Sequence, residues 1–245
     1  MERNAPCFCG SGKKQKKCHE DILPNSIVGT VIKHFIRMDN QIEMHRISLG
    51  IEFVCKKGCS SCCSDYFYTT EAEYLTIRNY LIKTFPKEEL SHCIDLGREA
   101  LDKLIEAFPE EYQKVSLSER DTFNSIFDDK MYLPSFCNCI FLRDDVCLIY
   151  PVRPEICRTH GYTEERTCEK AKTLVTDINL CLVPSVTESF LTDVNTYIRK
   201  GESPYFLKFK PLFYWFAKDE IFGKHYQAAI HSSREHFFRT LLHIN

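Results

Sequence analysis

Cysteine is the residue type that most constrains this chain, because 14 of its 245 residues are cysteines. Residues 1–10 contain no apolar segment typical of a secretory signal, and no stretch approaches the roughly 18 uncharged apolar residues of a membrane span. We therefore expect a cytoplasmic protein with no membrane partner. In a reducing compartment, clustered thiols are more often metal ligands or redox groups than disulfides. The sequence thus predicts a metal-binding protein.

Charge and the absence of common motifs narrow the function further. The net charge of −2 excludes a wholesale polyanion binder, and nucleic acid is not an expected partner except at the ribosome. The chain has no G-x-G-x-x-G, P-loop, G-x-S-x-G or H-E-x-x-H motif, and no pair of carboxylates stands out as acid and base. The sequence therefore assigns no catalytic residue and leaves open whether the protein is an enzyme.

The spacing of apolar residues predicts a mainly α fold. Asn25 or Ser26 could cap the first predicted helix, and Thr70 with Glu73 has the spacing of a capping box at the start of the second. Residues 131–163 contain three prolines and little helical pattern, which favours a loop-rich segment that carries ligands. The predicted helices of the first half of the chain cover residues 22–50, 70–85 and 88–108.

The cysteines divide the chain into three expected regions. A small zinc knuckle is expected over residues 1–21, before a helical metal-binding domain with irregular cysteine-rich loops over 22–181. Residues 182–245 contain no cysteine, and we expect them to form helices that pack on this domain. An aromatic cluster around Trp215 is expected to belong to the core.

The first cysteine motif lies in residues 5–19. A C-x-C pair and a Cys-His pair are separated by eight residues, and three thiolates with one imidazole match a closed tetrahedral zinc site. Gly10 and Gly12 allow the backbone between the pairs to turn tightly. So short a segment cannot fold by apolar burial alone, but structural zinc contributes about 10–16 kcal/mol in comparable peptides. The predicted zinc ligands are Cys7, Cys9, Cys18 and His19.

This stretch resembles the SEC-C motif, whose pattern is C-x-C-G-S-G-K-K-x-x-x-C followed by Cys or His. The resemblance implies bound zinc. In the motor protein of the preprotein translocase, a similar tail contacts a chaperone and the ribosome, which implies a candidate protein partner and an adaptor role. An acidic or phosphate-bearing surface would suit the lysines of the loop, which are Lys13, Lys14, Lys16 and Lys17.

The second cysteine motif has two halves. The first half places Cys55, Cys59, Cys62 and Cys63 within nine residues, and the second runs from Cys139 to Arg158. Thiolates at this density repel one another unless a cation holds them. The number of thiols exceeds what one tetrahedral ion needs, so two ions or one iron–sulfur cluster with spare thiols remain open.

Both halves are similar to the YkgJ-type cysteine-cluster family, also called the putative zinc- or iron-chelating domain. The similarity covers a core motif at about residues 51–170, with a glutamate-containing helix between the two halves. The cysteine Cys137 could replace Cys139, and Cys181 is a further candidate. The ligands that the resemblance implies are Cys55, Cys59, Cys62, Cys63, Cys139, Cys147, Cys157 and Cys168.

Three residues outside this ligand set have expected roles. Arg153 and Arg158 stand beside the implied ligands, and we expect them to offset thiolate charge and to donate hydrogen bonds to sulfur. The alternative is that both form surface ion pairs. Cys93 lies among apolar residues of a predicted helix, which indicates a buried structural thiol.

The metal of the central cluster and its use stay open in the sequence. All-thiolate ligands suit a second zinc site and a 4Fe–4S cluster alike. The Cys55–Cys63 run is also similar to that of flagellin lysine-N-methylases, which implies an iron–sulfur-dependent methyltransferase or oxidoreductase as an alternative function. We favour a metal-binding protein, with this enzyme and the adaptor as the alternatives.

Overall fold

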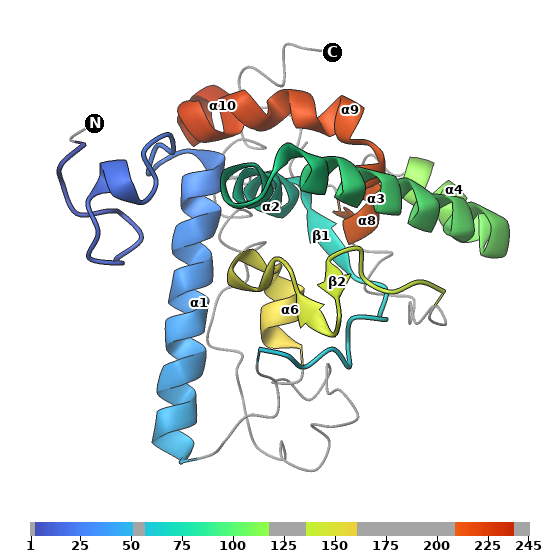
Figure 1. Cartoon of the computed structure of the whole chain (residues 1–245), viewed down its shortest axis with the longest axis horizontal. Helices are drawn as coiled ribbons and strands as arrows, with labels where there is room; N and C mark the ends of the chain where they lie inside the picture. Colours follow the sequence, from blue (N-terminus) through green and yellow to red (C-terminus); the bar gives the residue numbers. More distant parts are fainter. Residues whose placement is uncertain (1–2, 51–56, 118–135, 161–208, 238–245) are drawn as a thin grey trace, which may run out of the picture.

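The structure is a computed structural model and describes residues 3–50, 57–117, 136–160 and 209–237 (Figure 1). These residues are mostly helical, which confirms the predicted mainly α fold. Among them, no helix is both long and apolar enough to cross a membrane.

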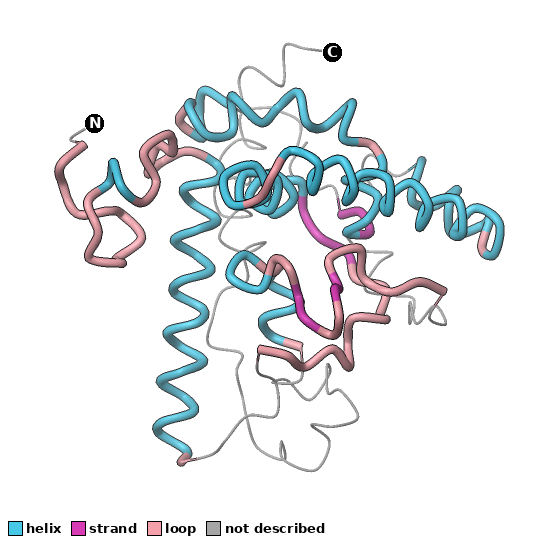
Figure 2. Tube along the Cα trace, in the orientation of Figure 1, coloured by secondary structure: helices cyan, strands magenta, loops and turns pink. Residues whose placement is uncertain are grey.

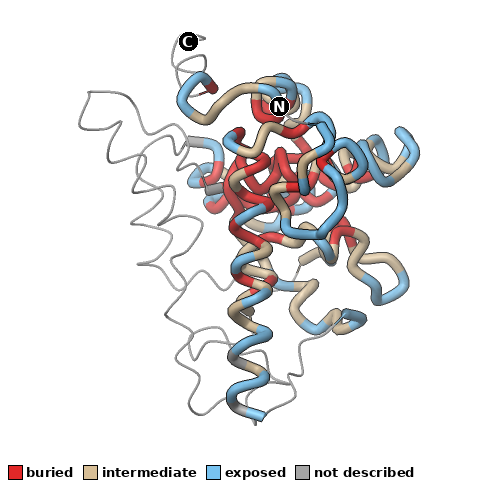
Figure 3. Tube along the Cα trace, turned by 90° about the vertical axis from the view of Figure 1, so that its left-hand side faces the viewer, coloured by how far each residue is buried: buried red, intermediate tan, exposed pale blue. Residues whose placement is uncertain are grey.

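Helix α1 spans Ile27–Leu49 and is the long helix at the edge of the molecule (Figure 1). Ser26, rather than Asn25, caps it, because the Ser26 hydroxyl accepts a hydrogen bond from the Gly29 amide at 3.1 Å. Gly50 ends the helix in the left-handed conformation. The first half of α1 is buried against the rest of the chain, and its exposure increases toward the C-terminal end (Figure 3).

The next helices form the centre of the fold. The predicted capping box opens the first of them: the Thr70 hydroxyl accepts from the Glu73 amide at 3.2 Å, and the Glu73 carboxylate accepts from the Thr70 amide at 2.8 Å. The predicted helices at 70–85 and 88–108 are thus confirmed to within about two residues. The three helices are α2 (Glu71–Thr84), α3 (Lys87–Ala107) and α4 (Pro109–Leu117).

A C-terminal segment completes this central layer. Strand β1 (Tyr68–Thr70) pairs antiparallel with β4 (Phe209–Pro211), and Thr69 faces Lys210 in the register. Residues 182–208 and 238–245 lie outside the described residues, so the helices expected there are not described. After β4 come α8 (Leu212–Ala217), α9 (Asp219–Phe222), the short 3-10 helix η5 (Gly223–His225) and α10 (Tyr226–His231).

The core is aromatic where α2, α3 and α8 meet. Trp215 is fully buried, and its ring stacks on Tyr74 with a centroid distance of 6.0 Å. Phe216 makes edge-to-face contacts with Tyr74 and with Phe141, both at 5.1 Å. The expected core role of the cluster around Trp215 is therefore confirmed for its described members. Gly97 of α3 permits the close approach of α8, since a Cβ there would lie 2.8 Å from the Ala217 amide nitrogen.

Residues 136–160 form a compact, mostly irregular segment below this core (Figure 2). A small hairpin turns through Asp144 and Asp145, whose φ angles of 47° and 61° match a two-residue turn. The loop-rich character expected for 131–163 holds in this described part. Its elements are β2 (Leu142–Arg143), β3 (Val146–Cys147), the 3-10 helix η2 (Tyr150–Val152) and α6 (Glu155–Thr159).

Candidate metal centres

The knuckle brings its predicted ligands together. The Cys7 sulfur lies 3.2 Å from His19 Nδ1, and the Cys9 sulfur lies 3.5 Å from the Cys18 sulfur. All four ligand atoms lie within 4.8 Å of one another. Zinc–sulfur bonds of about 2.3 Å in a tetrahedron place neighbouring sulfurs roughly 3.8 Å apart. The group therefore has the composition and the spacing that a structural zinc ion requires.

Tight backbone turns produce this arrangement. Gly10 and Gly12 both adopt φ of 73°, a conformation that disfavours any side chain. The Cys7 amide donates to the carbonyl of Lys13 at 2.8 Å, and Pro6 forms an isolated bridge with Lys14. The loop therefore folds back on itself and places the C-x-C pair opposite the Cys-His pair.

Gln15 is a structural residue of the knuckle that the sequence analysis did not single out. It begins the short 3-10 helix η1 (Gln15–Lys17), and its side chain is buried although lysines surround it in sequence. The side-chain amide donates to the carbonyls of His19 and Ile22 and accepts from the Phe8 amide at 3.4 Å. A buried amide thus replaces the apolar core that so small a unit lacks. The one feature of the sequence that could have indicated this role is that Gln15 is the uncharged residue within a run of lysines.

Burial shifts the pKa values of two knuckle ligands, Cys7 and His19. It raises the pKa of Cys7 to about 12 and lowers the pKa of His19 below its usual value. The imidazole is therefore neutral, as a zinc ligand must be, whereas the Cys7 thiol needs a cation before it loses its proton at neutral pH. Metal binding at this site releases protons and weakens as the pH falls.

The knuckle is attached to the helical body. The Leu23 amide donates to the Ile230 carbonyl of α10 at 2.9 Å, and the Phe8 side chain packs against the core. Asp21 forms an exposed ion pair with Lys83 of α2. Because these contacts involve α2 and α10, a folded knuckle also covers one end of the helical layer.

The central cysteines surround a single cavity of about 110 Å³. The two segments that supply them, residues 59–63 and 137–157, are joined in part by a hydrogen bond of 2.6 Å from the Cys139 amide to the Cys63 carbonyl. The sequence prediction included six of them and named Cys137 as a substitute. The cysteines lining the cavity are Cys59, Cys62, Cys63, Cys137, Cys139, Cys147 and Cys157.

These thiols share a cavity without forming a compact ligand group. Within the described residues, the knuckle is the one place where three or more ligand atoms lie within 4.8 Å of one another. The implied ligands Cys55 and Cys168, and the candidate Cys181, lie outside the described residues. A metal in the central cavity therefore remains a prediction, as does the ligand set.

Two deeply placed thiols of the cavity, Cys139 and Cys157, stay protonated in the absence of a cation. Burial raises the pKa of Cys139 to about 12. Burial also raises the pKa of Cys157 well above its usual value, and negative charge on Cys139, Cys62 or Cys147 raises it further. Repulsion between thiolates accounts for this further increase. A bound cation would remove it and would favour the thiolates.

Arg158 is fully buried, which contradicts the surface ion pair considered for it. Its guanidinium donates to the carbonyl of Pro151 at 2.7 Å and to that of Arg153 at 2.9 Å, and it also pairs with Asp39 of α1. Arg153 stacks over the ring of Tyr150 at 4.1 Å. The bonds of both arginines in the described structure go to oxygen rather than to the expected sulfur. Asp39 carried no signal in the sequence, since it looks like an ordinary helical carboxylate.

Arg153 nevertheless acts on sulfur through its charge. Burial raises the pKa of Cys147, and the nearby positive charge of Arg153 offsets part of that increase. The expectation that Arg153 and Arg158 offset thiolate charge stays a prediction, and the charge of Arg153 acts in that direction at Cys147.

Aromatic side chains form part of the cavity wall. Tyr66, Phe136 and Phe213 pack on one another there, with ring centroids 5.7–5.9 Å apart. Asp65 and His160 supply the polar part of this wall and form a pair at 3.5 Å. The sequence analysis assigned none of these residues to the site, because nothing local to them indicated that they would meet the cysteines; Phe213 belonged to the aromatic cluster expected in the core.

Cys93 is separate from both thiol groups. It is fully buried in α3, does not line the cavity, and its sulfur lies 3.8 Å from a carboxylate oxygen of Glu89. The prediction of a buried structural thiol is confirmed.

The geometry of the N-terminal residues is that of a short Cys3His knuckle suited to zinc. Comparison with known families identifies it more closely, since the family model named SEC-C motif matches residues 3–21. No match was found among curated proteins or among solved structures. The similarity of residues 51–170 to the YkgJ-type family is no part of that match and remains a prediction.

Proposed function

We propose that this chain is a metal-binding protein with two centres, zinc in the knuckle and a thiolate-bound metal in the central cavity. The observation that carries the second centre is the convergence of seven cysteines on one cavity. Ligation of a shared metal explains why cysteines from segments far apart in the sequence line the same cavity. In the described structure they are free thiols.

The experiment is metal analysis with an absorption spectrum, on protein purified without oxygen. We expect one zinc ion per chain from the knuckle and additional zinc or iron from the cavity. The double variant C139S/C157S should lose the additional metal only, and C7S/C18S should lose the knuckle zinc only. C93S is the matched control, because Cys93 is also a free thiol, is fully buried, and lies outside the cavity. A wild-type chain with a single zinc ion, unaffected by C139S/C157S, would overturn the second centre.

The same spectrum decides the nature of the central metal. Thiolate-bound iron gives a broad absorption near roughly 400 nm, whereas zinc gives none. Iron would favour the alternative of an iron–sulfur-dependent methyltransferase or oxidoreductase. The aromatic wall of Tyr66, Phe136 and Phe213 supports that alternative, because it leaves an apolar surface beside the thiols on which an organic substrate could lie.

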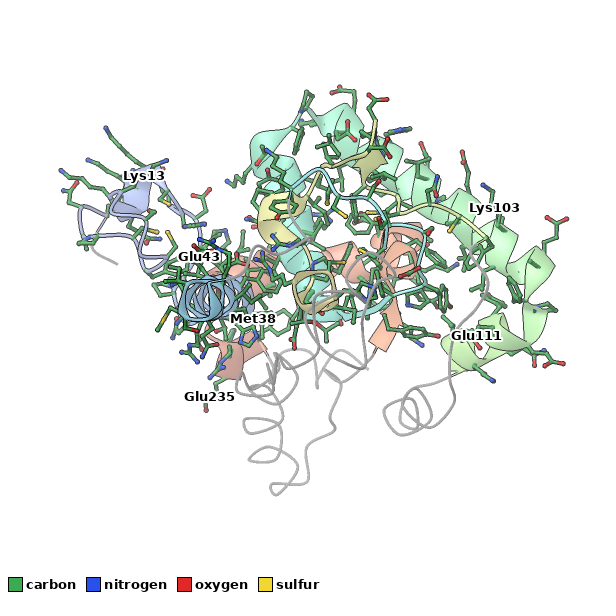
Figure 4. The ribbon with its side chains drawn as sticks, turned by 90° about the horizontal axis from the view of Figure 1, so that it is seen from below. Lys13, Met38, Glu43, Lys103, Glu111 and Glu235 are labelled. Carbon is green, nitrogen blue, oxygen red and sulfur yellow. The ribbon has the colours of Figure 1, made fainter. Side chains whose placement is uncertain are left out.

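A second candidate function is that of an adaptor that binds an acidic partner through the knuckle. Lysines 13, 14, 16 and 17 are all exposed, and Lys13 projects from the outer edge of the knuckle, away from the helical body (Figure 4). Replacing the four with glutamate should abolish capture of ribosomes or of protein partners while zinc is retained. Unchanged capture by the zinc-loaded variant would exclude this role.

A further inference from the structure

Asp39 connects the long helix α1 with the segment that carries Cys157. Its carboxylate pairs with Arg158 and lies 3.5 Å from the guanidinium of Arg153. Arg158 directly follows Cys157 in the sequence and extends the connection by donating to two loop carbonyls, at Pro151 and Arg153. One carboxylate on α1 therefore contacts both Arg153, in the turn between η2 and α6, and Arg158, within α6.

Because Arg158 is buried, its charge requires a paired carboxylate. The side chain has no exposed surface, and its guanidinium lies 4.3 Å from the ring centroid of Phe35. Asp39, whose side chain is about half exposed, is the carboxylate that pairs with it directly, and a buried guanidinium that loses its paired charge is strongly unfavourable. Removing the Asp39 charge should therefore displace Arg158, and Cys157 beside it, rather than leave the segment in place.

A second carboxylate holds the same segment from another helix. Glu73 of α2 accepts a hydrogen bond from the Glu155 amide at 2.9 Å, at the start of α6. The Cys157 segment is thus held by α1 at one side and by α2 at the other, and α6 lies between these helices and the hairpin (Figure 1).

We propose that Asp39 is a positioning residue for the central metal centre: through Arg158 it holds Cys157 at the cavity. This inference rests on the proposed second centre. It follows that the central centre forms only when α1 is docked, whereas the knuckle, whose ligands are all local, does not depend on Asp39.

The test measures the release of each metal to a chelator in wild type, D39N and D39E. We expect D39N to release the central metal at least tenfold faster and to lose sulfur-to-metal charge-transfer intensity after cobalt substitution. D39E, which keeps the charge, should restore most of both. Knuckle zinc should be released at the wild-type rate in all three chains and serves as the internal reference. D95N is the matched control, because Asp95 is an exposed helical aspartate that pairs with an arginine far from the cavity.

The outcomes separate the two proposals. A folded D39N chain with the wild-type spectrum and release rate would overturn the role of Asp39 and leave the second centre intact. A wild-type chain without central metal would instead overturn the second centre. If D39N does not fold, the R158K variant tests the positioning role instead. Lysine at this position keeps the ion pair with Asp39 but cannot donate to both loop carbonyls. Faster release from R158K supports the positioning role, and a wild-type rate contradicts it.

Discussion

A few polar side chains, two of them buried and the third about half exposed, hold both cysteine-rich parts of this protein together. Gln15 does so in the knuckle, and Arg158 with Asp39 does so beside the cavity. The knuckle ligands could be predicted because their pattern is local and their chemistry permits few alternatives. The three polar residues could not, because the value of each depends on a partner carbonyl or carboxylate that the sequence does not place.

Replacing Gln15 with leucine should weaken zinc binding without removing any ligand. The variant leaves the carbonyls of His19 and Ile22 without their buried donor, which costs about 1–3 kcal/mol. Zinc affinity should therefore fall by about tenfold or more, measured by competition with a chromophoric chelator. K16A, at an exposed neighbour, should bind zinc as the wild type does. Equal affinities of Q15L and K16A would contradict the structural role of Gln15.

His34 should make the fold sensitive to acid. Burial lowers its pKa to about 4, and the charges of Arg37 and Arg158 contribute. As the pH falls below about 6.5, His34 becomes protonated in the unfolded chain but stays neutral in the folded chain. The free energy of unfolding therefore decreases between about pH 6.5 and 4. The free energy of unfolding should drop by about 2 kcal/mol more between pH 7 and 5 in wild type than in H34Q, by urea titration. The H92Q variant, at an exposed histidine of α3, should show the wild-type dependence of the free energy of unfolding on pH. Any loss of knuckle zinc at low pH affects all three chains equally and cancels in the comparison.

The helices illustrate what periodicity and capping can predict. The first and third predicted helices begin and end within a few residues of α1 and α3, and the Thr70–Glu73 capping box is present as expected. The choice between Asn25 and Ser26 required the structure, because both are good caps. Strand β1 could not be predicted at all, since three residues pair with a segment about 140 residues away.

Replacing Ser26 with alanine should destabilise α1 specifically at its start. The Ser26 hydroxyl accepts from the Gly29 amide and donates to the Leu23 carbonyl at 2.7 Å, both in a buried position. We expect a loss of about 1–2 kcal/mol in the free energy of unfolding, measured with urea. N25A is the matched control and should lie within about 0.5 kcal/mol of wild type. A larger effect of N25A than of S26A would show that the cap is misassigned.

At the scale of the whole molecule, the fold depends on one close contact between distant segments. Gly97 of α3 lies against the backbone of α8, and the aromatic core around Trp215 forms on that contact. The spacing of apolar and aromatic residues predicted that α3 and α8 would each contribute side chains to the core. It could not place them against each other, nor could it show that the cysteine-bearing loops would gather beneath them around a cavity.

Replacing Gly97 with alanine should destabilise the protein, although alanine is the better helix former. At an exposed helical site this change gains about 1 kcal/mol. Here the added Cβ would lie 2.8 Å from the Ala217 nitrogen and 2.9 Å from the Phe213 carbonyl oxygen, so the helices must separate. We expect a net loss of about 1–3 kcal/mol and a lower Tm in calorimetry. S91A, on the exposed side of α3, should not lower the Tm, and a stabilised G97A would contradict the described packing.

The pairing of β1 with β4 also sets an order of events during synthesis. The core cannot close until residues 209–216 have left the ribosome, because β4 and α8 supply its missing side. The knuckle has all its ligands between residues 7 and 19, so it can take up zinc while the remainder is still being translated. The ligand group of the knuckle is thus complete in the nascent chain long before the thiols of the cavity are enclosed.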